Sequence, residues 1–158
     1  MSDTLQQLQD RREIEDLLYE YCDLVDAYEC EQIARLFTED CLYDFGPAFG
    51  GERRGNERLA RGAGRTLASW KATSHHVSNI RVHFEGADAA RVQTSLYAWH
   101  EPHDPAEPHF EVWARYRDRF VRTPAGWRIA ERRLVAAGQR GVDGPLTRLE
   151  RRETPRGD

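Results

Sequence analysis

Apolar residues recur every three or four positions along the first part of the chain: Ile14, Leu18, Tyr21, Val25 and Tyr28. This spacing is typical of one face of an α-helix, and it predicts a long amphipathic helix over residues 4–28. A second, short helix is expected over residues 31–37. A weaker helix is expected over residues 56–70, where Gly62 and Gly64 interrupt the pattern.

From residue 75 onward the apolar spacing changes to every second position, which predicts β-strands. A short strand is expected at residues 41–45, followed by four longer ones at residues 75–85, 90–101, 110–122 and 127–137. Glycine, aspartate and proline lie between these strands as turn residues, and three prolines indicate a longer loop before residue 109. Helices followed by antiparallel strands predict an α+β fold, in which a curved antiparallel sheet and the N-terminal helices form a cone-shaped pocket.

Two strands show which side chains share a face. In the strand at 110–122 one face is apolar, and the other mixes Trp113 with charged residues. This mixed face, with Tyr97 and Trp99, suits a homodimer or higher homo-oligomer. In the strand at 75–85, simple alternation places His75 and Asn79 on one face.

Composition limits the domain count and the partners. The chain has 158 residues and 39% hydrophobic residues, which predicts one α+β domain over residues 1–140 and a charged tail over residues 141–158. A net charge of −4 without a basic stripe argues against nucleic acid as a partner. No apolar run approaches the roughly 20 residues of a membrane span, and the polar start is unlike a signal peptide.

Three cysteines without metal-ligand spacing indicate a reducing, cytoplasmic environment, in which they are expected to be small buried residues. Lys71 is the lone lysine, which leaves few candidates for Schiff-base chemistry. The segment 100–109 holds three histidines and three carboxylates, but its prolines do not keep ligands at helix or strand spacing. It is therefore interpreted as a solvated loop, and no metal or other cofactor is expected.

The pair His75-His76 opens a strand about fifty residues after Asp26, at the edge of the first helix's apolar face. If His75 and Asp26 meet in one pocket, they form a general base near neutral pH, with the carboxylate orienting the imidazole. Taken alone, Asp26 is equally a solvated boundary residue, and a histidine at a strand start is often simply hydrogen-bonded.

Five short motifs lie in a characteristic order between about residues 13 and 134: Tyr21 with Asp26, Leu-Phe-Thr-Glu-Asp at 36–40, Ser-His-His-Val-Ser-Asn at 74–79, Tyr-Arg-Asp-Arg-Phe at 116–120 and Gly-Trp-Arg-Ile at 126–129. Through them the chain resembles the SnoaL-like branch of the nuclear-transport-factor-2-like superfamily. The resemblance implies a cystatin-like α+β barrel. It does not imply one reaction, because the fold hosts several.

The resemblance also implies a site. Scytalone dehydratase, bile-acid 7α-dehydratase and gamma-hexachlorocyclohexane dehydrochlorinase are members that use a helix aspartate and a histidine at the start of the long strand. Asp26 and His75 match those positions. His75 is preferred to His76 because it stands four residues before Asn79; a register shift of one residue would make His76 the base instead.

Further candidates surround this pair. Tyr21 stands five residues before Asp26, where the dehydrochlorinase has a lysine and the bile-acid dehydratase a tyrosine, so a substrate bearing oxygen is favoured. Tyr21 or Tyr43 can donate a hydrogen bond to an oxygen that gains negative charge, although each is equally a core residue. Arg132 resembles a pocket arginine of the dehydrochlorinase, and it either binds an acidic substrate group or pairs with a nearby carboxylate. The expected apolar lining is Phe45, Val112, Tyr116 and Leu134.

The function that these residues favour is that of a cofactor-independent lyase, such as a dehydratase, or an isomerase. Its substrate would be a small cyclic or aromatic molecule. Two alternatives remain open: a non-catalytic ligand-binding or partner-subunit member of the same fold, and a polyketide cyclase or hydroxylase.

Overall fold

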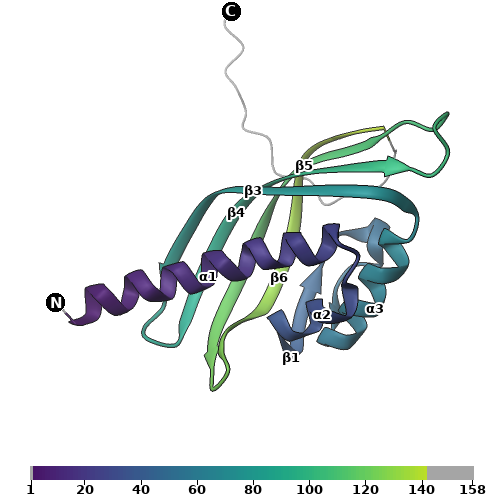
Figure 1. Ribbon diagram of the computed structural model, residues 1–158. Coiled ribbons are helices and arrows are strands. Elements are labelled where there is room, and N and C mark those ends of the chain that lie inside the picture. Colours follow the sequence, from purple (N-terminus) through teal and green to yellow (C-terminus); the bar gives the residue numbers. More distant parts are fainter. Residues whose placement is uncertain (1, 142–158) are drawn as a thin grey trace, which may run out of the picture.

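The computed structural model describes residues 2–141, which form three helices packed against one curved sheet (Figure 1). The α-helices are α1 (Ser2–Asp26), α2 (Cys30–Ile33) and α3 (Asn56–Leu67), with 3₁₀ turns at Ala34–Leu36 and Pro47–Phe49. The strands are β1 (Phe37–Asp44), β2 (Arg53–Arg54), β3 (Trp70–Phe84), β4 (Ala89–Pro102), β5 (Phe110–Thr123) and β6 (Gly126–Arg140). Except for Gly141, the predicted tail lies outside the described residues.

The strands are ordered β2-β1-β6-β5-β4-β3, and the four long strands pair antiparallel as predicted. The α+β prediction is confirmed, with two differences. The sheet is mixed, because β1 pairs parallel with β6. These two strands are far apart in the sequence, so no hairpin forces them to run in opposite directions. The sheet also stays open, with β2 and β3 at its edges, instead of closing into a barrel.

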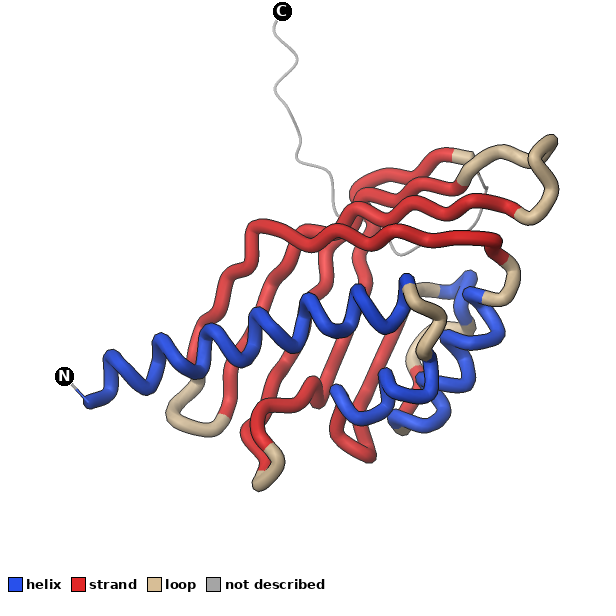
Figure 2. Tube along the Cα trace, viewed as in Figure 1, coloured by secondary structure: helices blue, strands red, loops and turns tan. Residues whose placement is uncertain are grey.

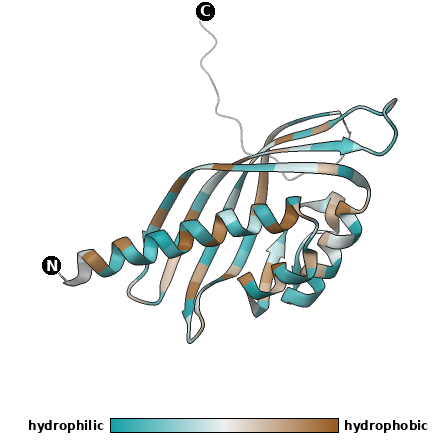
Figure 3. Ribbon diagram, viewed as in Figure 1, coloured by the Kyte–Doolittle hydropathy of each residue, from teal (hydrophilic) through white to brown (hydrophobic). Residues whose placement is uncertain are grey.

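Helix α1 crosses the concave face of the sheet, and α2 and α3 lie beside its C-terminal end (Figure 2). Hydrophobic and hydrophilic residues alternate around α1 (Figure 3), and the predicted apolar face is buried at Ile14, Leu18, Tyr21 and Val25. The helix ends two residues earlier than predicted. The backbone N–H groups of Tyr28 and Glu29 donate to the carbonyls of Val25 and Leu24, and Tyr28 takes a left-handed φ of 60°. This capping motif makes Asp26 the last helical residue.

Strand β3 begins at Trp70, five residues before the predicted start, and contains a β-bulge. Its pairing with β4 shifts between Ser78 and Arg81, and Asn79 adopts a φ of 52°. The extra residue reverses the alternation, so Ile80 packs against the core while Asn79 is exposed. The prediction that His75 and Asn79 share a face is therefore wrong.

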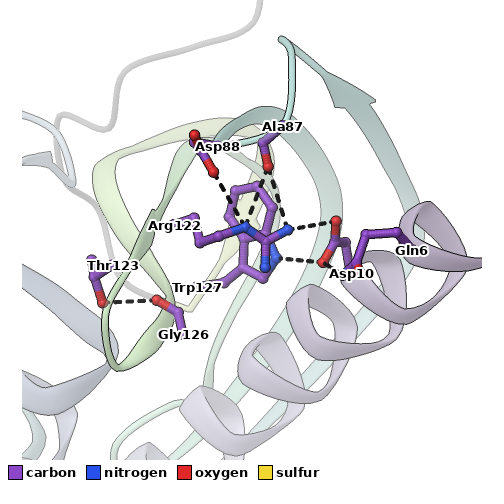
Figure 4. Close-up of polar contacts among 8 residues, drawn as sticks. All are labelled: Gln6, Asp10, Ala87, Asp88, Arg122, Thr123, Gly126 and Trp127. Atoms are coloured by element: carbon purple, nitrogen blue, oxygen red, sulfur yellow. Dashed lines mark hydrogen bonds and ion pairs between the residues drawn. The ribbon is translucent and has the colours of Figure 1, made fainter. Parts of the chain in front are cut away.

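A polar cluster around the buried Asp10 connects the first half of α1 to the β5–β6 hairpin (Figure 4). Asp10 accepts hydrogen bonds from the Trp127 indole N–H at 3.2 Å and from Gln6 at 3.0 Å, and it pairs with Arg122 at 2.6 Å. The Arg122 guanidinium lies 4.6 Å from the centre of the Trp127 ring. These contacts satisfy a carboxylate that would otherwise be costly to bury.

Within residues 2–141 no helix combines the length and the apolar character that crossing a bilayer requires.

Candidate active site

The end of α1 and the first part of β3 bring Asp26 and His75 together. The distance from His75 Nδ1 to Asp26 Oδ1 is 2.7 Å, and the His75 backbone N–H donates to Oδ2, also at 2.7 Å. The hydroxyl of Thr73 donates to Oδ1 at 2.8 Å. The predicted contact is confirmed. Because a carboxylate accepts at Nδ1, this nitrogen carries a ring proton, and Nε2 holds the lone pair in the neutral imidazole.

Asp26 keeps its negative charge in this setting. Burial opposes its ionisation, but hydrogen bonds from His75 and Thr73 outweigh that effect and lower the pKa of the carboxyl. The His75 side chain is only 9% exposed, against 26% for Asp26. The imidazole is therefore held between a fixed carboxylate and the protein interior.

His76 lies on the opposite face of β3. Its Nε2 is 2.9 Å from the Ser74 hydroxyl, and its ring centre is 6.0 Å from that of Tyr97 on the outer side of the sheet. The prediction that His76 points away from the pocket is confirmed, because neighbouring strand residues face opposite sides.

A cavity of about 740 Å³ lies between α1, α3 and the sheet, and His75 is part of its wall. Six of the other predicted site residues also line it: Tyr21, Tyr43, Phe45, Val112, Tyr116 and Leu134. Most of the remaining wall is aliphatic or aromatic. The size and lining suit a small, largely apolar ligand.

Two tyrosines of this wall keep their hydroxyl protons. Burial raises the pKa of Tyr21, although the positive charge of Arg132 opposes the rise. Burial also raises the pKa of Tyr43. Both hydroxyls are therefore hydrogen-bond donors at neutral pH.

Arg132 does not line the cavity. It is fully buried and forms a two-point ion pair with Asp118, at 3.0 and 2.7 Å. Burial would lower the pKa of its guanidinium, but the Asp118 carboxylate raises it, so Arg132 stays charged. Its guanidinium carbon lies 4.3 Å from the ring centre of Tyr21 and 4.1 Å from that of Tyr116. Of the two interpretations of Arg132, the structure shows the pairing with a nearby carboxylate.

His100, which falls in both the predicted strand 90–101 and the predicted loop 100–109, lies in β4 and lines the cavity. Its Nδ1 donates to the carbonyl of Phe110 at 3.3 Å, and its ring centre is 5.4 Å from that of His75. Burial, assisted by His75, lowers its pKa to about 4, so the ring is neutral at pH 7. In β4 the alternation of buried residues extends through Leu96 and Ala98 to His100. The same alternation, continued along the predicted strand, would have predicted that His100 faces inward.

The other two histidines of the segment 100–109 form hydrogen bonds with different partners. His103 contacts the carbonyl of Ala68 at 3.1 Å, and His109 accepts from the Trp99 indole at 3.2 Å. In the part of the chain that the structure describes, no group of three or more histidine, cysteine or acidic side chains is placed to hold a metal ion.

A second cavity of about 430 Å³ reaches Asp26 from another side. Asp26, Thr73, Lys71 and His103 line it, and Trp70 lines both cavities. The larger cavity therefore contacts the imidazole of the pair, whereas the smaller one contacts its carboxylate.

The model of the SnoaL-like domain family matches residues 6–133 of the chain. An uncharacterized protein of Mycobacterium tuberculosis strain H37Rv is 29% identical over 127 residues, which cover 80% of this chain and 84% of the relative.

Among solved structures, a Novosphingobium aromaticivorans protein provisionally named scytalone dehydratase is 25% identical, with a TM-score of 0.87. The match covers 97% of this chain and all of that one. A hexachlorocyclohexane dehydrochlorinase of type 2 has a TM-score of 0.79 at 18% identity, and the match covers 96% of this chain and 99% of that one. At 18% identity, this second match shows the shared fold alone.

Proposed function

We propose a function for this chain, which belongs to the SnoaL-like domain family: it is a lyase or isomerase that acts on a small cyclic or aromatic molecule. The observation that carries the proposal is the 2.7 Å contact between Asp26 and His75 at the wall of the cavity. The structural neighbour at 25% identity, provisionally named scytalone dehydratase, supports this class of reaction.

The reaction begins with His75. Its Nε2 takes a proton from a carbon next to a substrate carbonyl, and the electron pair of the broken C–H bond moves onto the carbonyl oxygen. Asp26 stabilises the imidazolium that forms. A base placed in this way accelerates proton transfer by roughly 10²- to 10⁴-fold. The hydroxyl of Tyr21 or Tyr43 donates to the oxygen that becomes negative.

The same imidazolium can complete two reactions. In elimination, the electron pair returns to form a C=C bond, the adjacent C–O bond breaks, and the leaving hydroxyl takes the proton from His75 to become water. In isomerisation, His75 returns the proton to a different carbon. His100 is neutral and keeps a lone pair on Nε2, so it can accept a hydrogen bond from a substrate hydroxyl and position it.

All of these steps use side chains of the chain itself, so we propose that turnover needs no cofactor. Activity should then survive a chelator. Loss of activity on chelation, restored by zinc or iron, would contradict this part of the proposal.

The three cysteines support a reducing compartment. Cys22, Cys30 and Cys41 are buried, unpaired thiols. Burial raises the pKa of Cys22 to about 12 and that of Cys41 to about 11, so both stay protonated at neutral pH. Unpaired thiols persist where the environment is reducing, and we therefore propose that the protein works in the cytoplasm.

The proposal can be tested with a panel of cyclic β-hydroxy ketones in D₂O, followed by proton NMR. Exchange of the proton next to the carbonyl reports the base, and an alkene signal reports elimination. Against an active substrate, His75→Ala and Asp26→Asn should each lose turnover by about 10²-fold or more. The double variant should be little worse, because both changes disable one step. Tyr21→Phe should have a smaller effect.

His76→Ala is the matched control, because its side chain lies on the outer face of the same strand, and it should keep full activity. Full activity in His75→Ala would reject the mechanism. Binding of panel members without exchange or elimination in the unmodified protein would instead favour the non-catalytic ligand-binding alternative.

A further inference from the structure

Three arginines contribute to the wall of the larger cavity: Arg53 of β2 and Arg58 and Arg65 of α3. Arg58 and Arg65 are exposed and Arg53 is partly exposed, so they belong to the part of the wall that reaches solvent. We call these three residues the arginine rim. His75, Val112 and Tyr116 belong to the more enclosed part of the same wall.

Among the described residues, no carboxylate neutralises the rim charges. Within residues 2–141, Arg58 and Arg65 make no hydrogen bond or ion pair. Arg53 donates only to the backbone carbonyl of its neighbour Glu52, at 3.0 Å. Two nearby exposed arginines do have partners: Arg61, also on α3, pairs with Glu57, and Arg133 pairs with Glu52.

The cavity supplies no compensating negative charge. No aspartate or glutamate among the described residues lines it, and Asp26 lies on the side of the smaller cavity. The rim also acts on the cavity interior. Burial raises the pKa of the Tyr43 hydroxyl, and the positive charges of Arg58, Arg53 and Arg65 oppose that rise. The field of the three arginines therefore extends to a side chain of the proposed reaction site.

Helix α3 presents its two rim arginines together. Arg58 and Arg65 are seven positions apart, which places them two turns apart on one helix face. Gly62 lies between them on that face and also lines the cavity. A Cβ atom at Gly62 would meet nothing within 4 Å, so open space separates the two arginines.

We propose that the arginine rim binds an anionic group of the substrate, so that the ligand class is an apolar ring system carrying a carboxylate or phosphate. The planar guanidinium matches both groups, and it binds them through charge-assisted hydrogen bonds. An anion held at the rim directs the apolar part of the molecule into the cavity toward His75. This inference rests on the proposed function only for the identity of the ligand as substrate; the binding itself does not require turnover.

The test uses probes of one shape and different charge: 2-naphthoate and 2-naphthyl phosphate as anions, and 2-naphthamide as the neutral counterpart. Binding to the full chain is measured by isothermal titration calorimetry. Both anions, or one of them, should bind at least about fivefold more tightly than the amide. Added salt should weaken binding of the anions but not binding of the amide, because salt screens the exposed charges of the rim. The tighter anion identifies the group that the substrate carries.

Arg58→Gln and Arg65→Gln are the test variants, and each should weaken binding of the preferred anion by about five- to tenfold. Both should leave amide binding within about twofold of the unmodified protein. Arg58→Lys should recover part of the loss. Arg61→Gln is the matched control, because it removes the same charge from the same helix at a position outside the cavity, and it should change anion binding by less than twofold. Circular dichroism confirms that each exposed variant is folded.

Three results would overturn the proposal: equal or tighter binding of the amide, no anion binding at millimolar concentration, or an equal loss in Arg61→Gln and Arg58→Gln. None of them depends on catalysis. Binding is measured without turnover, so failure of the rim and failure of the proposed reaction are separable outcomes.

Discussion

The proposed chemistry of this molecule depends on hydrogen bonds between a few side chains. Asp26 accepts three hydrogen bonds, from the ring and backbone of His75 and from Thr73. The first of them was predicted through the family resemblance, because Asp26 and His75 match the aspartate and histidine positions of that family. The sequence did not predict the contact of Thr73, which depends on the extension of β3 back to Trp70.

Removing Arg132 should destabilise the fold, because Asp118 would be left as an unpaired buried charge. We expect Arg132→Ala to lower the free energy of unfolding by about 3–5 kcal/mol. Replacing both partners, as in Arg132→Met with Asp118→Leu, should recover most of the loss. Urea denaturation measures both values. A stable Arg132→Ala variant that loses only ligand binding would contradict this structural role.

His100 should make stability depend on pH in the acid range. Its pKa is about 4 in the folded protein, against an ordinary value of 6.5. As pH falls from about 6.5 to about 4, the unfolded chain gains a proton that the folded chain does not. Up to about 3 kcal/mol of stability should therefore be lost across this window, while none of this contribution is lost above it.

Urea denaturation at several pH values measures this effect. In His100→Phe, the free energy of unfolding should depend less on pH between pH 6.5 and 4. His83→Gln, which changes an exposed histidine of β3, is the control and should leave the dependence unchanged. An equal slope in His100→Phe and the unmodified protein would contradict the assignment.

At the level of elements, periodicity predicted the helices and long strands but not their irregularities. The helix face at Ile14 and Leu18 is buried as expected. The bulge at Asn79 was missed because simple alternation assumes one residue per pairing step. The capping of α1 at Tyr28 was also missed, since a tyrosine is rarely found in the left-handed region.

The bulge gives a prediction about β3. Because Asn79 has a φ of 52°, Asn79→Val should lower the free energy of unfolding by about 1–2 kcal/mol, and Asn79→Gly should be tolerated. Thermal or urea denaturation distinguishes the two. If the valine variant is as stable as the glycine variant, β3 does not keep this backbone conformation in solution.

The whole molecule combines a predicted fold with features that lie beyond local pattern. The order of helices and strands predicted an α+β cone, and the sheet curves around α1 as expected. The parallel pairing of β1 with β6 was not predicted, because it joins distant segments without a connecting turn. The arginine rim was likewise missed, since it requires β2 and α3 to meet at one cavity.

We also expect the chain to form a two-fold dimer through the outer face of the sheet. Trp113 is 43% exposed there, and its ring centre is 5.6 Å from that of Tyr97. Sedimentation should show a dimer that Trp113→Glu dissociates. Tyr19→Glu, a change at a similarly exposed aromatic on α1, should not. A lone 18.3 kDa species at micromolar concentration would contradict the dimer.

The most direct test of the central claim is the protonation of the His75 ring, measured by ¹⁵N NMR with labelled histidine. The account predicts that neutral His75 carries its proton on Nδ1 and presents an unprotonated Nε2, and that Asp26→Asn loses this preference because an amide can donate to Nδ1. His76 provides the internal comparison, and its signals should not change in Asp26→Asn. A neutral His75 protonated on Nε2 in the unmodified protein would show that no base faces the cavity, and would contradict the account.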